Sequence, residues 1–152
     1  MPEVRIPAFA KINLRLDILG RRPDGFHELR TIFQTISLHD ELRLRASRRP
    51  GIALRVERNQ PLSAEPAERN LVYRAVDALH RELKIRGGVE IELKKTIPAG
   101  RGLGGGSSDA AAALLGICGS RRRNWRPRDC WESPLLSARM SRFSSWVGVR
   151  WE

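Results

Sequence analysis

Apolar and polar residues alternate along the first part of the chain, which predicts β-strands with one buried face. Between residues 10 and 18 the apolar side chains share one face, which consists of Ile12, Leu14, Leu16 and Ile18. Residues 20–25 have the glycine, proline and aspartate chemistry of a turn, and residues 29–38 form a second β-rich run. Together the two runs predict a β-hairpin with a long tip.

Further elements follow from the same alternation and from one helical repeat. Alternation predicts strands over residues 42–44, 52–56 and 89–94. Between the last two, apolar residues recur at steps of three and four, and they are Val72, Ala75, Val76, Leu79 and Leu83. This spacing predicts an amphipathic helix of about four turns that ends at Gly87 and Gly88.

The segment after the last predicted strand has the order strand, glycine loop, helix, which suits phosphate binding. Five of residues 100–106 are glycine, and the alanine-rich run 110–115 is a strong helix former. Glycine lets the backbone approach an anion without interference from a Cβ, and the N–H groups that start a helix point toward it. Ser107 and Ser108 can cap this helix or donate to phosphate oxygens. A flexible linker is the alternative, but the strand and helix on either side disfavour it.

The loop differs from two common nucleotide-binding motifs. A Walker loop requires a Lys immediately before the Ser, and Gly106 stands there. The loop also lacks the glycine spacing and the downstream acid of a dinucleotide fingerprint. Asp109, which follows the two serines, is expected to be an acid of the first helical turn rather than a base.

Composition changes abruptly near residue 117. Residues 1–117 carry 20 basic and 14 acidic residues, whereas residues 118–152 carry 8 and 3, and all eight basic residues there are Arg. The same stretch holds all four tryptophans and both cysteines. Such a composition is typical of GC-rich DNA read out of frame. The alternative is a genuine basic arm, in a small module that binds RNA or DNA, since basic residues interleaved with aromatics suit nucleic acid.

Several classes of protein are excluded by what the sequence lacks. No run approaches the roughly 18 consecutive apolar residues of a membrane span. The N-terminus opens polar and has no signal-peptide pattern, and two cysteines supply neither a disulfide framework nor a set of metal ligands. The sequence therefore predicts a cytoplasmic protein with no membrane partner and no metal held by its own side chains.

The glycine loop resembles the P-x-x-x-G-L-G-[GS]-[GS]-S-S loop of the GHMP kinases, which phosphorylate small alcohols such as galactose, homoserine and mevalonate. Three further segments occur in the order found in the branch that acts on a cytidine-diphosphate-linked methylerythritol in isoprenoid (terpenoid) biosynthesis. They are residues 7–14, with Lys11 and Asn13, residues 22–29, and residues 70–72. The resemblance over residues 1–117 implies an α+β fold, with a two-layer α/β N-terminal domain like domain 2 of ribosomal protein S5, and a missing C-terminal lobe.

The resemblance also implies a reaction and its residues. The γ-phosphoryl group of ATP, with Mg²⁺ as cofactor, would be transferred to a hydroxyl of the methylerythritol compound, a small-molecule substrate. Lys11 would be the catalytic lysine that stabilises the developing negative charge. Phe26 and His27 would hold the cytosine by stacking and hydrogen bonding, with Asn13 near the same site. The implied ATP-binding residues are Pro98, Ala99, Gly100, Arg101, Gly102, Leu103, Gly104, Gly105, Gly106, Ser107 and Ser108.

One motif of the family is absent from the chain. After the glycine-loop helix the family carries G-A-D-V-P-F-F-L-x-G-G, whose Asp is the general base. No such string occurs here. A shifted reading frame over residues 138–152, in which the last base of each codon joins the first two bases of the next, allows the string. In that frame Met140 with Ser141 yields Val, and Trp146 with Val147 yields Gly. We therefore expect residues 118–152 to be an out-of-frame, non-native tail, and the chain to be an inactive, truncated form.

Overall fold

The computed structural model describes residues 3–21, 23, 25, 27–58 and 66–120. The N-terminal hairpin consists of β1 (Val4–Arg21) and β2 (His27–Ser47). The remaining elements, in chain order, are β3 (Ile52–Arg58), the 3₁₀ turn η1 (Ala67–Arg69), α1 (Leu71–Glu82), β4 (Gly88–Lys95) and α2 (Gly105–Ser120).

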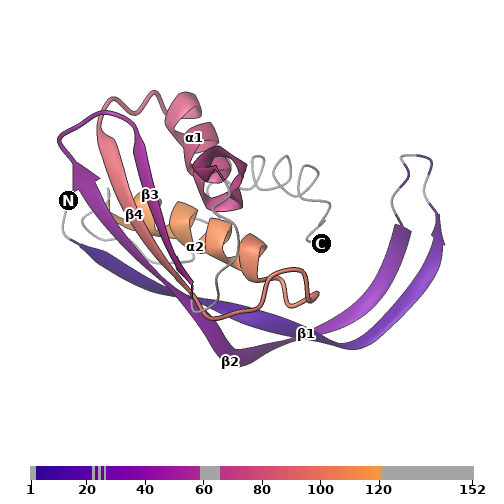
Figure 1. The fold of residues 1–152 in the computed structure, drawn as a ribbon. Helices are drawn as coiled ribbons and strands as arrows, with labels where there is room; N and C mark the ends of the chain where they lie inside the picture. Colours follow the sequence, from indigo (N-terminus) through magenta and orange to yellow (C-terminus); the bar gives the residue numbers. More distant parts are fainter. Residues whose placement is uncertain (1–2, 22, 24, 26, 59–65, 121–152) are drawn as a thin grey trace.

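The strands form one mixed sheet in the order β1-β2-β4-β3. β2 pairs antiparallel with both β1 and β4, whereas β3 and β4 are parallel, and α1 lies in the connection between these two. Both helices lie on the same side of the sheet (Figure 1). The two-layer α+β arrangement implied by the resemblance is therefore confirmed.

The core fills the space between the helices and one face of the sheet. Leu42 and Leu44 of β2, Ile91 and Leu93 of β4, and the buried residues of α1 and α2 form one cluster. α2 contributes mainly alanines, and its Gly116 has no room for a side chain, because a Cβ there would lie 2.2 Å from Leu44 Cδ1. Small residues on α2 thus allow the helix to approach the sheet closely.

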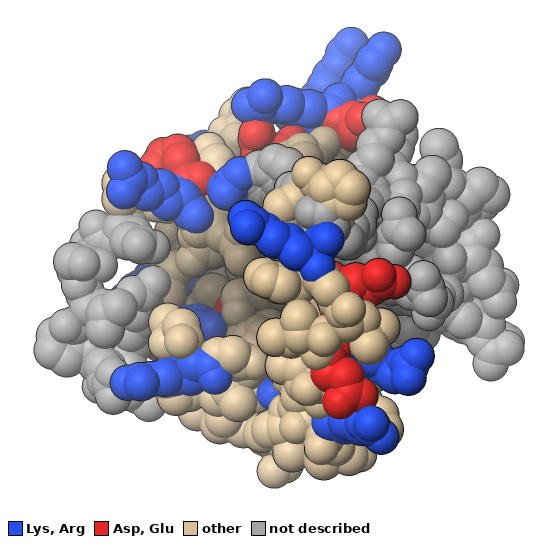
Figure 2. Space-filling view, turned by 90° about the vertical axis from the view of Figure 1, so that its right-hand side faces the viewer, with Lys and Arg blue, Asp and Glu red and all other residues tan. Residues whose placement is uncertain are grey.

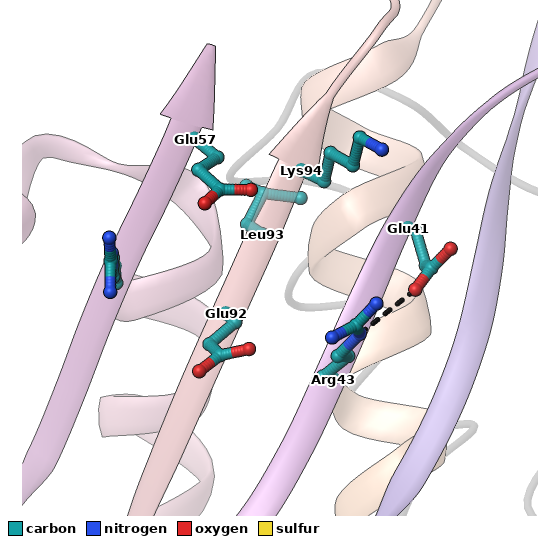
Figure 3. Close-up of a pocket in the computed structure, with 7 residues that line it drawn as sticks. Glu41, Arg43, Glu57, Glu92, Leu93 and Lys94 are labelled. Atoms are coloured by element: carbon teal, nitrogen blue, oxygen red, sulfur yellow. Dashed lines mark hydrogen bonds and ion pairs between the residues drawn. The ribbon is translucent and has the colours of Figure 1, made fainter.

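The other face of the sheet carries charged side chains in a complementary pattern. Glu92 of β4 is opposite both Arg43 and Arg55, and Lys94 is opposite both Glu41 and Glu57. Opposite charges in facing positions stabilise strand pairing modestly. The pocket on this face is lined by these six residues and Leu93, and Figure 3 shows their side chains spread across three strands.

The hairpin departs from the sequence prediction in its length and in its burial. Residues 29–38 and 42–44, predicted as separate strands, are parts of the single strand β2. The four residues predicted to share one buried face do not share it, because a β-bulge between Asn13 and Arg15 puts Ile12 on the opposite face from Leu16 and Ile18. All four, Ile12, Leu14, Leu16 and Ile18, are also between 36% and 66% exposed. Figure 1 gives the reason, because the outer half of the hairpin extends past both helices and no described element covers it. Alternation therefore predicts the faces of a strand only where no bulge interrupts it, and it does not predict what lies against them.

Both helices form where they were predicted, with different ends. α1 buries Val72, Ala75, Val76 and Leu79, but it stops at Glu82. The positive φ of 51° at Lys84 turns the chain there, well before Gly87, so Leu83 is outside the helix and 38% exposed. α2 starts inside the glycine loop and continues to Ser120, three residues past the boundary predicted at 117.

The rest of the predicted tail, residues 121–152, lies outside the described residues, as do Phe26 and most of the turn around it. In the described part of the chain, no helix has the length and apolar character needed to cross a membrane.

Candidate active site

The glycine loop joins the end of β4 to the start of α2. Gly100, Gly102 and Gly104 have φ values of 71°, 73° and 71°, a backbone region that side chains with a Cβ rarely adopt. Ser108 N donates to Gly104 O at 2.9 Å, which is the first bond of the helical ladder. The N–H groups of the residues between these two have no acceptor within the helix, so they remain available to an anion.

Lys11 lies directly beside this helix start. Its backbone N donates to Leu103 O at 3.0 Å, which ties β1 to the loop. Its side chain runs along Gly104, where an added Cβ would lie 3.2 Å from Lys11 Cγ. The Nζ atom is 5.2 Å from the centroid of the Phe33 ring, within range of a cation–π contact. The structure thus brings together the predicted catalytic lysine and the predicted ATP-binding loop, two segments far apart in the sequence.

Asn13 holds the Lys11 ammonium in place through a chain of hydrogen bonds. Lys11 Nζ donates to Asn13 Oδ1 at 2.5 Å, and Asn13 Nδ2 donates to Thr31 Oγ1 at 2.7 Å. Thr31 Oγ1 in turn donates to Arg15 O at 2.7 Å. Because Thr31 orients the Asn13 amide, its oxygen faces the lysine. No sequence pattern points to Thr31, since only the register of the hairpin reveals that it lies beside Asn13.

His27 is far from these residues along the hairpin. Thr35 of β2 pairs with Lys11, and His27 pairs with Arg21 at the other end of the ribbon. Eight residues of β2 separate the two positions, about 26 Å along the strand. The hairpin therefore does not place His27 next to Asn13, although it curves toward the helix side of the molecule (Figure 1).

A buried ionic cluster lies behind the glycine loop. Lys95, at the end of β4, donates through Nζ to Asp40 Oδ2 of β2 and, at 2.7 Å, to Asp109 Oδ2 of α2. Asp40 Oδ1 also accepts from the backbone N of Thr96 at 2.5 Å and of Ile97 at 2.8 Å. The Asp40 and Asp109 side chains are almost completely buried, with 0% and 2% exposed.

The two carboxyl groups of this cluster have opposite pKa shifts. Burial raises the pKa of Asp40, but the Lys95 ammonium and the two backbone N–H groups outweigh it and hold that pKa below its usual value. Burial raises the pKa of Asp109 to about 7, against the opposing effect of Lys95. Asp109 Oδ1 has no hydrogen-bond partner among the described residues, which leaves the charged form poorly stabilised.

Asp109 is thus not the first-turn acid predicted from the sequence, because the first turn of α2 contains no acid. The pattern did contain a signal for the cluster. Asp40 lies at the same alternate positions as the buried Leu42 and Leu44, and Lys95 at those of Ile91 and Leu93. A charged residue at a core-facing position requires a partner of opposite charge, and Asp40 and Lys95 are partners of each other.

Charges on the surface near the hairpin are mixed in sign. Figure 2 faces the side toward which the hairpin extends, and there acidic side chains are interspersed among the basic ones. Within the described ranges, no group of three or more His, Cys, Asp or Glu residues is arranged to hold a metal ion. The pocket of Figure 3 is on the charged outer face of the sheet, whereas the ionic cluster and the loop lie on its helix-covered side.

Comparison with known proteins yields many relatives, and several of them carry the same enzyme name. Residues 70–138 match the family described as the GHMP kinases N terminal domain. A 4-diphosphocytidyl-2-C-methyl-D-erythritol kinase of Pelotomaculum thermopropionicum is 52% identical over 110 residues, which cover 72% of this chain and 37% of the relative. One of Methylococcus capsulatus is 46% identical over 116 residues, which cover 76% and 38%. The chain spans 33–41% of the length of such relatives.

Solved structures share the fold. A crystal structure of 4-(cytidine 5'-diphospho)-2C-methyl-D-erythritol kinase matches with a TM-score of 0.62 and 37% identity, over 81% of this chain and 42% of that one. Homoserine kinase from Cytophaga hutchinsonii has a TM-score of 0.58 at 21% identity, over 82% of this chain and 37% of that one, which is a likeness of fold alone. By its sequence relatives, its fold and its glycine loop, the chain belongs to the GHMP kinases and carries their N-terminal domain.

Proposed function

We propose that this chain supplies the ATP-binding loop and the catalytic lysine of a cytoplasmic kinase that phosphorylates a hydroxyl of 4-diphosphocytidyl-2-C-methyl-D-erythritol in isoprenoid biosynthesis. The observation that carries the proposal is the position of Lys11, which is bonded through its backbone to the glycine loop and lies against the start of α2. Curated relatives named for this kinase support the choice of substrate.

In this proposal the triphosphate lies between the helix start and Lys11. The free N–H groups of the first turn of α2 hold phosphate oxygens, and the helix dipole adds to their attraction. The substrate hydroxyl forms a bond to the γ-phosphorus while the bond from that phosphorus to the β–γ bridging oxygen breaks, and ADP leaves. The Lys11 ammonium, oriented by Asn13, stabilises the negative charge that develops on the transferred group. Asn13 thereby acts on substrate chemistry through the lysine.

The proton of the substrate hydroxyl requires a base, and the described residues that hydrogen-bond around Lys11 do not provide one. The Lys11 ammonium bonds to the amide of Asn13, which in turn bonds to the hydroxyl of Thr31, and neither group is a base. Asp109 is buried and bonded to Lys95. We therefore assign the base to the Asp of the motif that the shifted reading of residues 138–152 allows. We also propose that residues 1–117 are the N-terminal domain of the kinase and that residues 118–152 are out of frame.

Mg²⁺ fits this site only as a partner of the ATP phosphates. Mg²⁺ is commonly held by one or two carboxylates together with phosphate oxygens. Of the described carboxylates next to the loop, Asp40 and Asp109 are both buried against Lys95, so neither is presented to a bound nucleotide. The hydroxyls of Ser107 and Ser108, at the helix start, would be the side-chain oxygens available to the metal there.

The direct test is an enzyme assay after the reading frame is restored near codon 118. We expect ADP formation that depends on 4-diphosphocytidyl-2-C-methyl-D-erythritol. Lys11→Ala should lower kcat about 100-fold or more, with little change in ATP affinity, because the lysine acts in the transition state. Lys94→Ala, on the outer face of the sheet, is the matched control and should leave kcat unchanged. A folded protein that consumes ATP only with other alcohols, or a fully active Lys11→Ala variant, would contradict the proposal.

A further inference from the structure

Asp40 connects the middle of the sheet to the beginning of the glycine loop. One oxygen of its carboxylate accepts from the backbone N–H groups of Thr96 and Ile97, the two residues that follow β4. The other oxygen accepts from Lys95. The Asp40 side chain is completely buried, so it cannot contact a substrate. Its hydrogen bonds nevertheless determine where the chain leaves the sheet and turns into the loop.

Lys95 extends this connection to the helix on the other side of the loop. Its ammonium bonds to Asp109, one turn into α2. The cluster lies immediately behind the helix start, because a Cβ on Gly105 would be 3.3 Å from Lys95 Nζ and 2.9 Å from Ile97 Cγ2. The segment that enters the loop and the helix that leaves it are therefore held by one set of buried charges.

We propose that Asp40 is a positioning residue that holds the glycine loop in place beside Lys11. It fixes the residues that enter the loop directly, through their backbone N–H groups, and it fixes the start of α2 indirectly, through Lys95. The inference rests on the proposed function of the loop as an ATP site. A buried ionic cluster is costly to desolvate, and apolar residues of similar size often stabilise a core equally well. Such a cluster instead fixes the position of the backbone around it. Phosphoryl transfer depends strongly on how the groups that bind the phosphates are placed.

Two substitutions in the 152-residue chain distinguish the bonds of Asp40 to the Thr96 and Ile97 backbone from its bond to Lys95. Asp40→Ala removes both, so the amide protons of Thr96, Ile97 and Ser108 should exchange with solvent about tenfold faster or more. Asp40→Asn keeps an acceptor for Thr96 and Ile97 but places an NH₂ group against the Lys95 ammonium. In that variant the exchange at Ser108 should rise and that at Thr96 and Ile97 should change little. Glu41→Gln, the neighbouring carboxylate on the opposite face of β2, is the matched control.

Amide exchange measured by NMR also distinguishes positioning from general stability. A merely structural role would raise exchange equally in α1 and β3, and that result, or no change in residues 96–108, would overturn the proposal. If Asp40→Ala does not fold, the isosteric Asp40→Asn decides alone. ATP affinity should fall about tenfold in Asp40→Asn and stay unchanged in Glu41→Gln. Absence of ATP binding by the unaltered chain would instead contradict the kinase proposal, while the exchange pattern still tests the role of Asp40.

Discussion

At the scale of single residues, the five loop glycines serve two different purposes. Gly100, Gly102 and Gly104 have positive φ values, so their role is conformational. Gly105 and Gly106 are helical, and neighbouring side chains restrict the space for a Cβ at both. At Gly105 the Cβ would lie 2.9 Å from Ile97 Cγ2, whereas at Gly106 it would make a tight contact of 3.2 Å with Leu71 Cδ1. For Gly105 those neighbours lie behind the helix, in the cluster around Lys95, rather than on the side where a phosphate would approach.

Gly105→Ala should therefore weaken ATP binding by displacing the start of α2. The new Cβ would lie 2.9 Å from Ile97 Cγ2, too close for an unstrained contact, so the helix start must shift away from its buried neighbours. We expect ATP affinity to fall about tenfold by isothermal titration calorimetry. Gly20→Ala is the control, since an added Cβ there meets nothing within 4 Å. Equal affinity in the two variants would show that the loop tolerates a shift of its helix.

Asp109 should make the stability of the protein depend on pH between about 4 and 7. Its pKa is raised from 3.8 to about 7 in the folded state, so in this range the folded state binds more protons than the unfolded state. The free energy of unfolding therefore falls as pH rises, by up to about 4 kcal/mol for this group. Asp40, whose pKa is lowered, stabilises the folded state above about pH 4, and this contribution is lost as pH falls below that value.

The measurement is urea unfolding at about pH 4.5 and about pH 7.5 for the original chain and for Asp109→Asn. The amide cannot ionise, so the variant should lose less stability over this range than the original chain. The comparison cancels the contributions of other titrating groups. Parallel pH profiles for the two proteins would mean that Asp109 ionises in the folded state as easily as in the unfolded one.

At the scale of elements, the close approach of α2 to the hairpin strands depends on Gly116. A Cβ at this position would lie 2.2 Å from Leu44 Cδ1 and 2.9 Å from Ile6 Cδ1, and Leu44 is fully buried. Gly116→Ala should thus lower the free energy of unfolding by about 1–3 kcal/mol, an overpacking cost that exceeds the gain in helix propensity. Gly87→Ala, which meets nothing within 4 Å, should leave stability nearly unchanged. Denaturant unfolding of both variants checks this, and a stabilised Gly116→Ala would show that α2 can move outward at little cost.

At the scale of the whole molecule, the described part of the chain forms one hydrophobic core. Its buried members run from Ala8 to Ile117, and the partly buried Cys118 also packs against them. A chain that ends at Ser120 should accordingly still unfold cooperatively, with a free energy of unfolding within about 0.5 kcal/mol of that of the 152-residue chain. Its ATP affinity should also be unchanged. Circular dichroism and calorimetry measure both. If residues 121–152 formed a nucleic-acid-binding arm, the deletion would instead abolish a salt-sensitive affinity for oligonucleotides.

The sequence by itself determined the local features of this protein. Alternation predicted the strands, the steps of three and four predicted α1, and the glycines between β4 and α2 predicted the loop. These features could be predicted because each depends on residues close together in the chain. The roles of Lys11 and Asn13 came from the family resemblance, and they remain predictions to be tested, as does that of His27.

Only the tertiary structure decided which of these features meet. The pairing of β1 with β2 placed Thr31 beside Asn13, and the packing of α2 on the sheet brought Asp109 to Lys95 and Asp40. The same packing left Leu16 and Ile18 exposed, because the hairpin is longer than the helices that cover the sheet. Alternation tells which side of a strand a residue occupies only where the strand has no bulge, and the bulge between Asn13 and Arg15 reverses it within β1. What lies against that side depends on the register and length of distant segments, which no local pattern encodes.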